Sequence, residues 1–277
     1  MTAIRLIGEH HQAFVEQFKQ LNASRHTHNE PDDNIVYLAH NTVTVDEIKA
    51  LLDKDAGLVL PISAIQSVTY YQQVKQFVDQ INAEVKWVNT CASHPHFHAM
   101  AEQLEAVDFT DKAINRITVY KNQADKTQTL AQQLLGLYMW LESTMSPVTS
   151  IMAVEREKAT HRVLVLSIQH EAGTMTNVQL VYTDDTEHVA IEVTGANGML
   201  VQQSDSEQGA VVLSKGNRAV LDSVFSKKEV QNVWQAIHQG VDEKSQEKRI
   251  EKGLGLVEAT EQSLESKRPV SVKGVSQ

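Results

Sequence analysis

The chain has 277 residues and a mass of 30.9 kDa, which suits one large domain or two of moderate size. Its 25 basic and 35 acidic residues give a net charge of −10, which argues against nucleic acid or an anionic membrane as a partner. No apolar run approaches the ~20 residues of a membrane helix, and the N-terminus lacks the apolar region of a signal peptide. We therefore expect a soluble, cytoplasmic protein. The single cysteine, Cys91, excludes an intramolecular disulfide framework and a cysteine-rich zinc site.

The first part of the chain alternates strand-like and helix-like segments. We expect strands at 3–8, 34–40, 57–63 and 84–89, and helices at 10–21, after Thr44 and at 67–82. Thr44 and Glu47 have the spacing of a capping box. The helix at 67–82 is expected to bury Val68, Tyr71, Val74, Val78 and Ile81. The polar segment 22–33 is interpreted as a loop. This alternation indicates βαβ units with a parallel sheet.

The rhythm changes after about residue 112, where strand-like runs follow one another through short turns. The expected strands are 115–121, 148–154, 161–169, 176–183 and 188–195, and the expected helices are 127–142, 227–239 and 244–266. We therefore predict an α/β plus α+β fold. A shortened Rossmann-like domain of parallel strands (1–112) precedes an α+β domain with a largely antiparallel open sheet (113–277), and the helix at 244–266 packs back on the first domain.

Four segments together resemble a known family. IEVTGANGMLVQQ (191–203) is similar to a hairpin that Gly195 and Gly198 bracket, and VWQAIHQGV (233–241) resembles a helix that follows it. A closing helix with a basic-Pro-Val end is resembled by RIEKGLGLVEATEQSLESKRPVSV (249–272). A bridge between two domains is resembled by HPHFHAMAEQLEAVDFTDKAINRITVYK (94–121). In this order and spacing they resemble the Gfo/Idh/MocA family of NAD(P)-dependent oxidoreductases. The resemblance spans nearly the whole chain and implies a Rossmann domain followed by a sheet-based domain.

The cofactor fingerprint that this resemblance implies is degenerate. The family has a glycine-rich loop at its first strand–helix turn, and here that stretch is Gly8-Glu9-His10-His11-Gln12-Ala13. His10 stands where the second glycine is usual, so an imidazole would occupy the space of the pyrophosphate. The segment 22–33 is too short and polar to supply the strand that carries the ribose-binding acid, although Glu30, Asp32 or Asp33 could substitute from a loop.

We therefore expect no cofactor, with NAD or NADP as the alternative. The residues assigned to the remaining ligand crevice are Gly8, His10, His11, His40 and Pro61.

The family's catalytic residues are also unmatched. The resemblance implies a lysine in a Glu-Lys-Pro motif, and the aligned residues here are Val59, Leu60 and Pro61. It also implies an Asp and a His four residues apart, for which alignment on Trp140 gives Thr129 and Gln133. Neither side chain can relay a proton at neutral pH.

Histidines form the other notable pattern. The cluster His94-x-His96-x-His98, with His26-x-His28 and His10-His11, could supply transition-metal ligands. Pro95 makes a regular strand improbable there, so the three rings are expected to fan around a helix start. Solvated or capping histidines are the favoured interpretation, and no metal site is predicted.

Other side chains have a simpler interpretation. Cys91 with His94 could form a thiolate pair, but a lone buried thiol is favoured. Trp87, Tyr138 and Trp140 are expected to fill the core at the domain seam.

Three functions stay open at this point. The first is a non-catalytic protein that binds or senses a small molecule between its domains. The second is an active NAD(P)-dependent oxidoreductase on a sugar, polyol or related hydroxy compound, and the third is a scaffold or partner subunit. Runs such as 161–169 and 176–183 place apolar residues on both faces of the C-terminal sheet, so we expect a homodimer or homotetramer formed through it.

Overall fold

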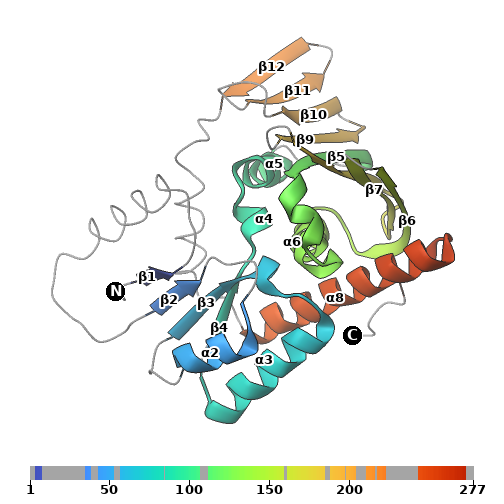
Figure 1. Cartoon of the computed structure of the whole chain (residues 1–277). Helices are drawn as coiled ribbons and strands as arrows, with labels where there is room; N and C mark the ends of the chain where they lie inside the picture. The colour runs from blue at the N-terminus through green and yellow to red at the C-terminus, as the bar shows by residue number, and fades with distance from the viewer. Residues whose placement is uncertain are drawn as a thin grey trace, which may run out of the picture.

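The computed structural model describes most of the chain and shows two sheets joined by helices (Figure 1). The described residues are 4–7, 35–38, 43–52, 57–83, 85–106, 112–158, 161–184, 188–196, 198–203, 210–215, 217–222 and 243–272. The predicted helices at 10–21 and 227–239, and the predicted loop at 22–33, lie outside them. None of the described helices is both long and apolar enough to cross a membrane.

The first sheet is parallel, as the alternating pattern predicted. Its strands are β1 (Ile4–Ile7), β2 (Ile35–Leu38), β3 (Gly57–Pro61) and β4 (Val85–Val88), in the spatial order β1-β2-β3-β4. The connecting helices are α2 (Val45–Leu52) and α3 (Val68–Ile81), and a 3₁₀ turn, η1 (Ile62–Ala64), follows β3. Leu58, Val59 and Leu60 on β3 are almost fully buried, which is typical of a parallel strand covered on both faces.

The helices of this first part begin at capping residues. The Thr44 amide donates to Glu47 Oε2 at 2.7 Å and the Glu47 amide donates to Thr44 Oγ1 at 3.2 Å, which confirms the predicted capping box. Ser67 caps α3 in the same way. Tyr71 and Val74 of α3 are buried as predicted, but Ile81 is 41% exposed, so its predicted burial was wrong. Ile81 is the last residue of α3. It keeps the helical spacing of the apolar residues, but this end of the helix extends past the hydrophobic core.

The second sheet has nine strands and is open and largely antiparallel, as predicted. Its order is β12-β11-β10-β9-β5-β8-β7-β6-β13, and only the β5–β8 pair is parallel among the described strands. The strands are β5 (Lys112–Asn122), β6 (Val148–Lys158), β7 (His161–His170), β8 (Met175–Thr183), β9 (His188–Gly195), β10 (Gly198–Gln203), β11 (Ala210–Lys215), β12 (Asn217–Asp222) and β13 (Val270–Ser271). Strands β11 and β12 were not predicted.

The remaining helices lie beside this sheet. They are α4 (Thr90–Ser93), α5 (Pro95–Ala106), the 3₁₀ helix η2 (Gln123–Thr127), α6 (Leu130–Thr144) and α8 (Glu243–Ser266). Helix α6 lies on the concave side of the sheet and is buried almost all round (Figure 1). Trp140 donates from Nε1 to the Phe97 carbonyl at 3.1 Å, and Tyr138 shares a 2.5 Å hydrogen bond with Thr260 of α8. Both aromatic residues, like Trp87, belong to the core as predicted.

Helix α8 contacts both sheets. Near its start the Gln246 amide pairs with the backbone of Trp87 on β4, donating to its carbonyl at 2.5 Å and accepting from its amide at 3.4 Å. Further along, Ser263 Oγ accepts a 2.9 Å hydrogen bond from the Ala153 amide on β6. The helix thus connects the edge of the parallel sheet to the nine-stranded sheet.

Two glycines in α8 provide a matched test of how tightly this helix packs on α6. A Cβ at Gly253 would lie 2.5 Å from Leu135 Cδ1, whereas a Cβ at Gly255 would meet nothing within 4 Å. Alanine favours a helix over glycine by about 1 kcal/mol, so Gly255→Ala should raise the free energy of unfolding by up to that amount. Because Leu135 is fully buried, we expect Gly253→Ala to lower it by about 1–2 kcal/mol instead. Urea denaturation of both variants checks this, and a stabilised Gly253→Ala would show that α6 and α8 can move apart.

Candidate functional site

A cavity of about 460 Å³ lies where α4, α5 and α6 meet strands β5, β8 and β9. Its wall combines apolar and polar side chains. The lining residues are Ser63, Thr90, Cys91, His94, His96, Phe97, Val119, Tyr120, Lys121, Asp125, Gln132, Gln133, Gly136, Leu137, Leu180, His188 and Val189. Segments from before and after residue 112 therefore contribute polar groups to one cavity.

Of the aligned catalytic positions, only Gln133 lines this cavity. Its Nε2 donates to the Gln128 carbonyl at 2.7 Å, and its buried Oε1 has no hydrogen-bond partner among the described residues. Thr129 instead begins α6 as an exposed capping residue, accepting from the Gln132 amide at 3.3 Å and donating to the Gln66 carbonyl at 2.7 Å. The two residues predicted at neighbouring positions of one site therefore have different roles.

The end of β3 is apolar where the family has its catalytic lysine. Leu60 is 0% exposed, and Pro61 is buried and precedes η1. Neither lines the cavity, whereas Ser63, two residues on, does. The assignment of Pro61 to the cofactor crevice stays a prediction. The other crevice residues of the prediction, Gly8, His10, His11 and His40, lie outside the described residues.

Two histidines of the predicted cluster line the cavity, and a third lies elsewhere. His94 ends α4 and His96 begins α5, with ring centroids 5.2 Å apart, so the rings do fan around a helix start. Burial, reinforced by His96, lowers the pKa of His94 to about 4. Burial, reinforced by His188, also lowers the pKa of His96. At neutral pH both rings are uncharged and can accept hydrogen bonds.

The hydrogen bonds of these rings differ. His96 Nδ1 lies 2.7 Å from Gln202 Nε2, which donates to it. In the part of the chain that the structure describes, the buried Nδ1 of His94 has no hydrogen-bond partner. His98 contacts Glu102 instead, at 3.3 Å. Within the described ranges no three metal-ligating side chains come together. The density of histidines was the sequence signal for this part of the site, although the alignment with the family did not place it there.

Cys91 has no nucleophilic character. Burial raises the pKa of its thiol to about 12, in spite of Lys121 nearby, so the thiol is protonated at neutral pH. This result agrees with the prediction of an inert thiol rather than a thiolate pair.

Glycine 136 allows the close approach of α4 and α6 at the cavity wall. Asn89 caps α4 by accepting from the Ala92 amide at 3.2 Å, and its Nδ2 donates to the Gly136 carbonyl at 2.9 Å. A Cβ at Gly136 would lie 2.8 Å from Asn89 Oδ1. Only glycine leaves this capping interaction undisturbed.

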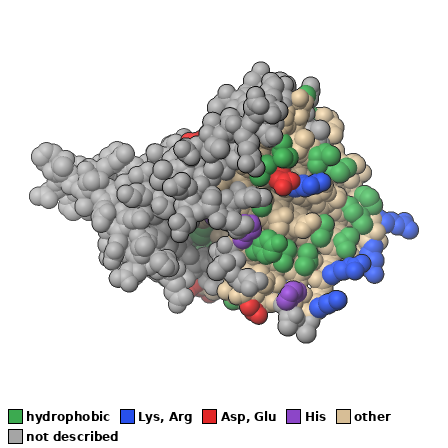
Figure 2. All heavy atoms as spheres, turned by 90° about the horizontal axis from the view of Figure 1, so that it is seen from above, with side chains coloured by type: hydrophobic (Ala, Val, Ile, Leu, Met, Phe, Trp, Pro, Cys, Tyr) green, Lys and Arg blue, Asp and Glu red, His purple; other side chains and the backbone are tan. Residues whose placement is uncertain are grey.

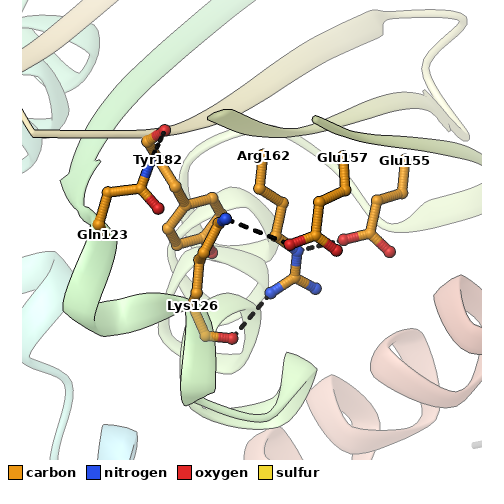
Figure 3. A network of polar contacts seen from close by, with 6 residues as sticks. All are labelled: Gln123, Lys126, Glu155, Glu157, Arg162 and Tyr182. Carbon is orange, nitrogen blue, oxygen red and sulfur yellow. Dashed lines mark hydrogen bonds and ion pairs between the residues drawn. The ribbon is translucent and has the colours of Figure 1, made fainter. Parts of the chain in front are cut away.

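A network of polar contacts holds η2, which carries Asp125, against the sheet (Figure 3). Arg162 on β7 pairs with Glu155, donates to the Lys126 carbonyl at 2.9 Å and lies over the Tyr182 ring. Lys126 pairs with Glu157 at 3.2 Å. Because η2 is fixed at both its backbone and its side chains, Asp125 has a defined position on the cavity wall.

Comparison with known proteins gives information on the fold. No family model and no curated protein matches the sequence. Among solved structures, an NAD-binding oxidoreductase from Klebsiella pneumoniae is 11% identical, with coverage of 98% of this chain and 99% of that one and a TM-score of 0.69. The apo form of levoglucosan dehydrogenase is 10% identical over 99% of both chains, with a TM-score of 0.69.

A third solved structure is similar over the same length. Scyllo-inositol dehydrogenase from Lactobacillus casei, with NAD(H) and scyllo-inositol bound, is 11% identical over 98% of this chain and 99% of that one, with a TM-score of 0.66. These likenesses confirm the fold that the sequence resemblance predicted. The chain has the fold of the Gfo/Idh/MocA-type NAD-binding oxidoreductases.

Proposed function

We propose that the protein binds a small hydroxylated molecule in the central cavity and does not transfer hydride. The proposal rests on a contrast between the cavity wall and the positions aligned with the family's catalytic residues. The cavity wall presents hydrogen-bonding side chains from both parts of the chain, whereas the aligned catalytic positions hold Leu60, Thr129 and Gln133. A pocket of about 460 Å³ with a few convergent polar groups is typical of a small-molecule site.

The polar groups of the wall match hydroxyl groups. Gln133 and His94 each have a buried polar atom without a partner, and a buried polar atom without a hydrogen bond is costly. The neutral His94 ring accepts a hydrogen bond, and Ser63 and Thr90 add hydroxyls that donate or accept. A ligand whose hydroxyls both donate and accept would satisfy such a wall.

Two features support a site without the dinucleotide that the fold implies. Doubly wound sheets bind dinucleotides where the strand order reverses, at the carboxyl ends of the strands. The described strands run β1-β2-β3-β4 without a reversal, and the sequence at the first turn carries His10 in place of a glycine. The alternative, an active NAD(P)-dependent oxidoreductase, is supported by the similar structures, one of which has NAD(H) and a polyol bound.

Calorimetric titration with NAD(H) and NADP(H) separates these functions. Loss of charge-assisted contacts that contribute about 1.5–3 kcal/mol each should weaken a micromolar affinity to millimolar or worse. We also expect no turnover with either nicotinamide in a screen of sugars and polyols followed by absorbance. Micromolar binding of either cofactor, or steady turnover on any polyol, would favour the oxidoreductase and contradict our proposal.

We also propose that a second copy of the chain covers the outer face of the nine-stranded sheet. Ile114, Val154 and Met175 are between 38% and 46% exposed there, and Figure 2 shows hydrophobic side chains gathered on this face beside cationic ones. Arg116 and Glu192 lie on the same face, so each copy offers both charges to the other. A scaffold subunit that uses this face for a different partner is the alternative.

Sedimentation equilibrium tests this assembly. Met175→Glu should convert a dimer or tetramer to monomers at micromolar concentration, because it places a charge in the apolar interface. The control is Ile81→Glu, an equally exposed apolar residue on α3 outside the sheet. If the wild-type protein is a monomer, the proposal is contradicted. The alternative, a scaffold subunit that binds a different partner through this face, is then favoured.

A further inference from the structure

Among the described residues of the cavity wall, Lys121 is the one lysine or arginine, and the alternation of β5 determines the face on which it lies. Along β5 the covered face of the sheet carries Asn115 and Ile117, which are 0% and 1% exposed, and then Val119. Because side chains alternate along a strand, Lys121 continues this covered row rather than the outer one. A lysine is rarely placed on such a face without a counter-charge.

Lys121 has no acidic partner at ion-pair distance among the described residues. It takes part in none of the ion pairs or hydrogen bonds there, although Asp125 lies on the same wall. Asp125 Oδ1 accepts instead from Gln128 Nε2 at 2.9 Å. Lys121 and Cys91 line the same cavity, and Lys121 lies close enough for its charge to act on the Cys91 thiol.

We propose that Lys121 binds a carboxylate group of the ligand, which would make that ligand a small hydroxycarboxylate. This inference rests on the proposed function and specifies its ligand class. One ammonium group among neutral imidazoles matches a single negative charge. A phosphate carries nearly two charges and is usually bound by arginine or by several backbone amides, and the wall offers no arginine. The carboxylate of Asp125 can in turn accept a hydrogen bond from a ligand hydroxyl.

Calorimetry with matched ligand pairs tests the inference. The hydroxycarboxylates glycerate, threonate and gluconate are compared with the polyols glycerol, threitol and glucitol, which lack only the charged group. A charge-assisted hydrogen bond contributes enough to make at least one acid bind about 10- to 100-fold more tightly than its polyol. Lys121→Met should remove this preference, and Lys121→Arg should restore part of it.

Controls separate loss of the charge from loss of the fold. Lys49→Met removes the same charge from a lysine outside the cavity and should leave the preference unchanged. Thermal denaturation of Lys121→Met shows whether that variant is folded. If polyols bind as tightly as their acids, or Lys121→Met keeps the preference, this inference is overturned while the proposed function stands. If no acid and no polyol binds, both are overturned.

Discussion

Replacing Leu60 with lysine is expected to destabilise the protein by about 4 kcal/mol and to produce no dehydrogenase activity. The change restores the residue type that the family has at this position of its Glu-Lys-Pro motif. Leu60, however, is 0% exposed on β3, where it belongs to the hydrophobic core. Lysine at this position would either bury an unpaired charge or lose its proton, and both outcomes cost free energy on folding.

Leu60→Met is the matched control, because it keeps an apolar side chain of similar volume and should cost less than about 1.5 kcal/mol. Urea denaturation gives the free energy of unfolding of both variants, and a nicotinamide absorbance assay gives turnover. A folded Leu60→Lys protein that oxidises a polyol would mean that β3 can present this side chain to the cavity, and that our alignment with the family is mechanistically relevant.

Acidification is expected to destabilise the protein through His94. Its pKa is lowered from 6.5 to about 4 by burial and by His96, so the unfolded chain binds more protons than the folded one below pH 6.5. The stabilisation is therefore complete above pH 6.5 and is lost as the pH falls toward 4. From the one-unit equivalence of about 1.4 kcal/mol, the loss should reach about 2 kcal/mol at pH 5.

His94→Gln removes the titrating ring and should flatten this dependence between pH 7 and 5. The control is His161→Gln, because His161 is exposed at the start of β7. Urea denaturation at several pH values supplies the measurement. If wild type and His94→Gln lose the same free energy on acidification, another group causes the loss. His96 and His170 would then be the next to test, because burial lowers the pKa of each ring.

Much of the fold could be predicted because local patterns and tertiary packing agree. The capping box at Thr44 and the alternating strands of the first part each follow from a few neighbouring residues, and the structure has them where they were predicted. Strands β11 and β12 were missed although they pair with one another in a hairpin. The parallel pairing of β5 with β8 could not be inferred from strand patterns, because it joins segments about sixty residues apart.

The candidate site was less accessible to sequence reasoning. Alignment with the family directed attention to Leu60 and Thr129, neither of which lines the cavity. Lys121 was passed over because it ends an apolar strand, where a lysine is usually solvated. Its position became informative only once the alternation of β5 and the absence of an ion partner were known. Tertiary packing decides which face of β5 is covered, so the sequence alone does not show that Lys121 lies on the cavity wall.

The pairing of Gln246 with Trp87 has a consequence for the synthesis of the chain. A strand at the border of a sheet offers unpaired backbone groups to any other extended chain. The side-chain amide of Gln246 occupies both groups of Trp87 on β4, yet it lies 159 residues later in the sequence. These two groups of Trp87 therefore wait for Gln246 while the ribosome makes β5 to β12, and they are paired only when the last helix emerges. A chain truncated before α8 should therefore expose backbone groups of β4 and aggregate more readily than the full chain.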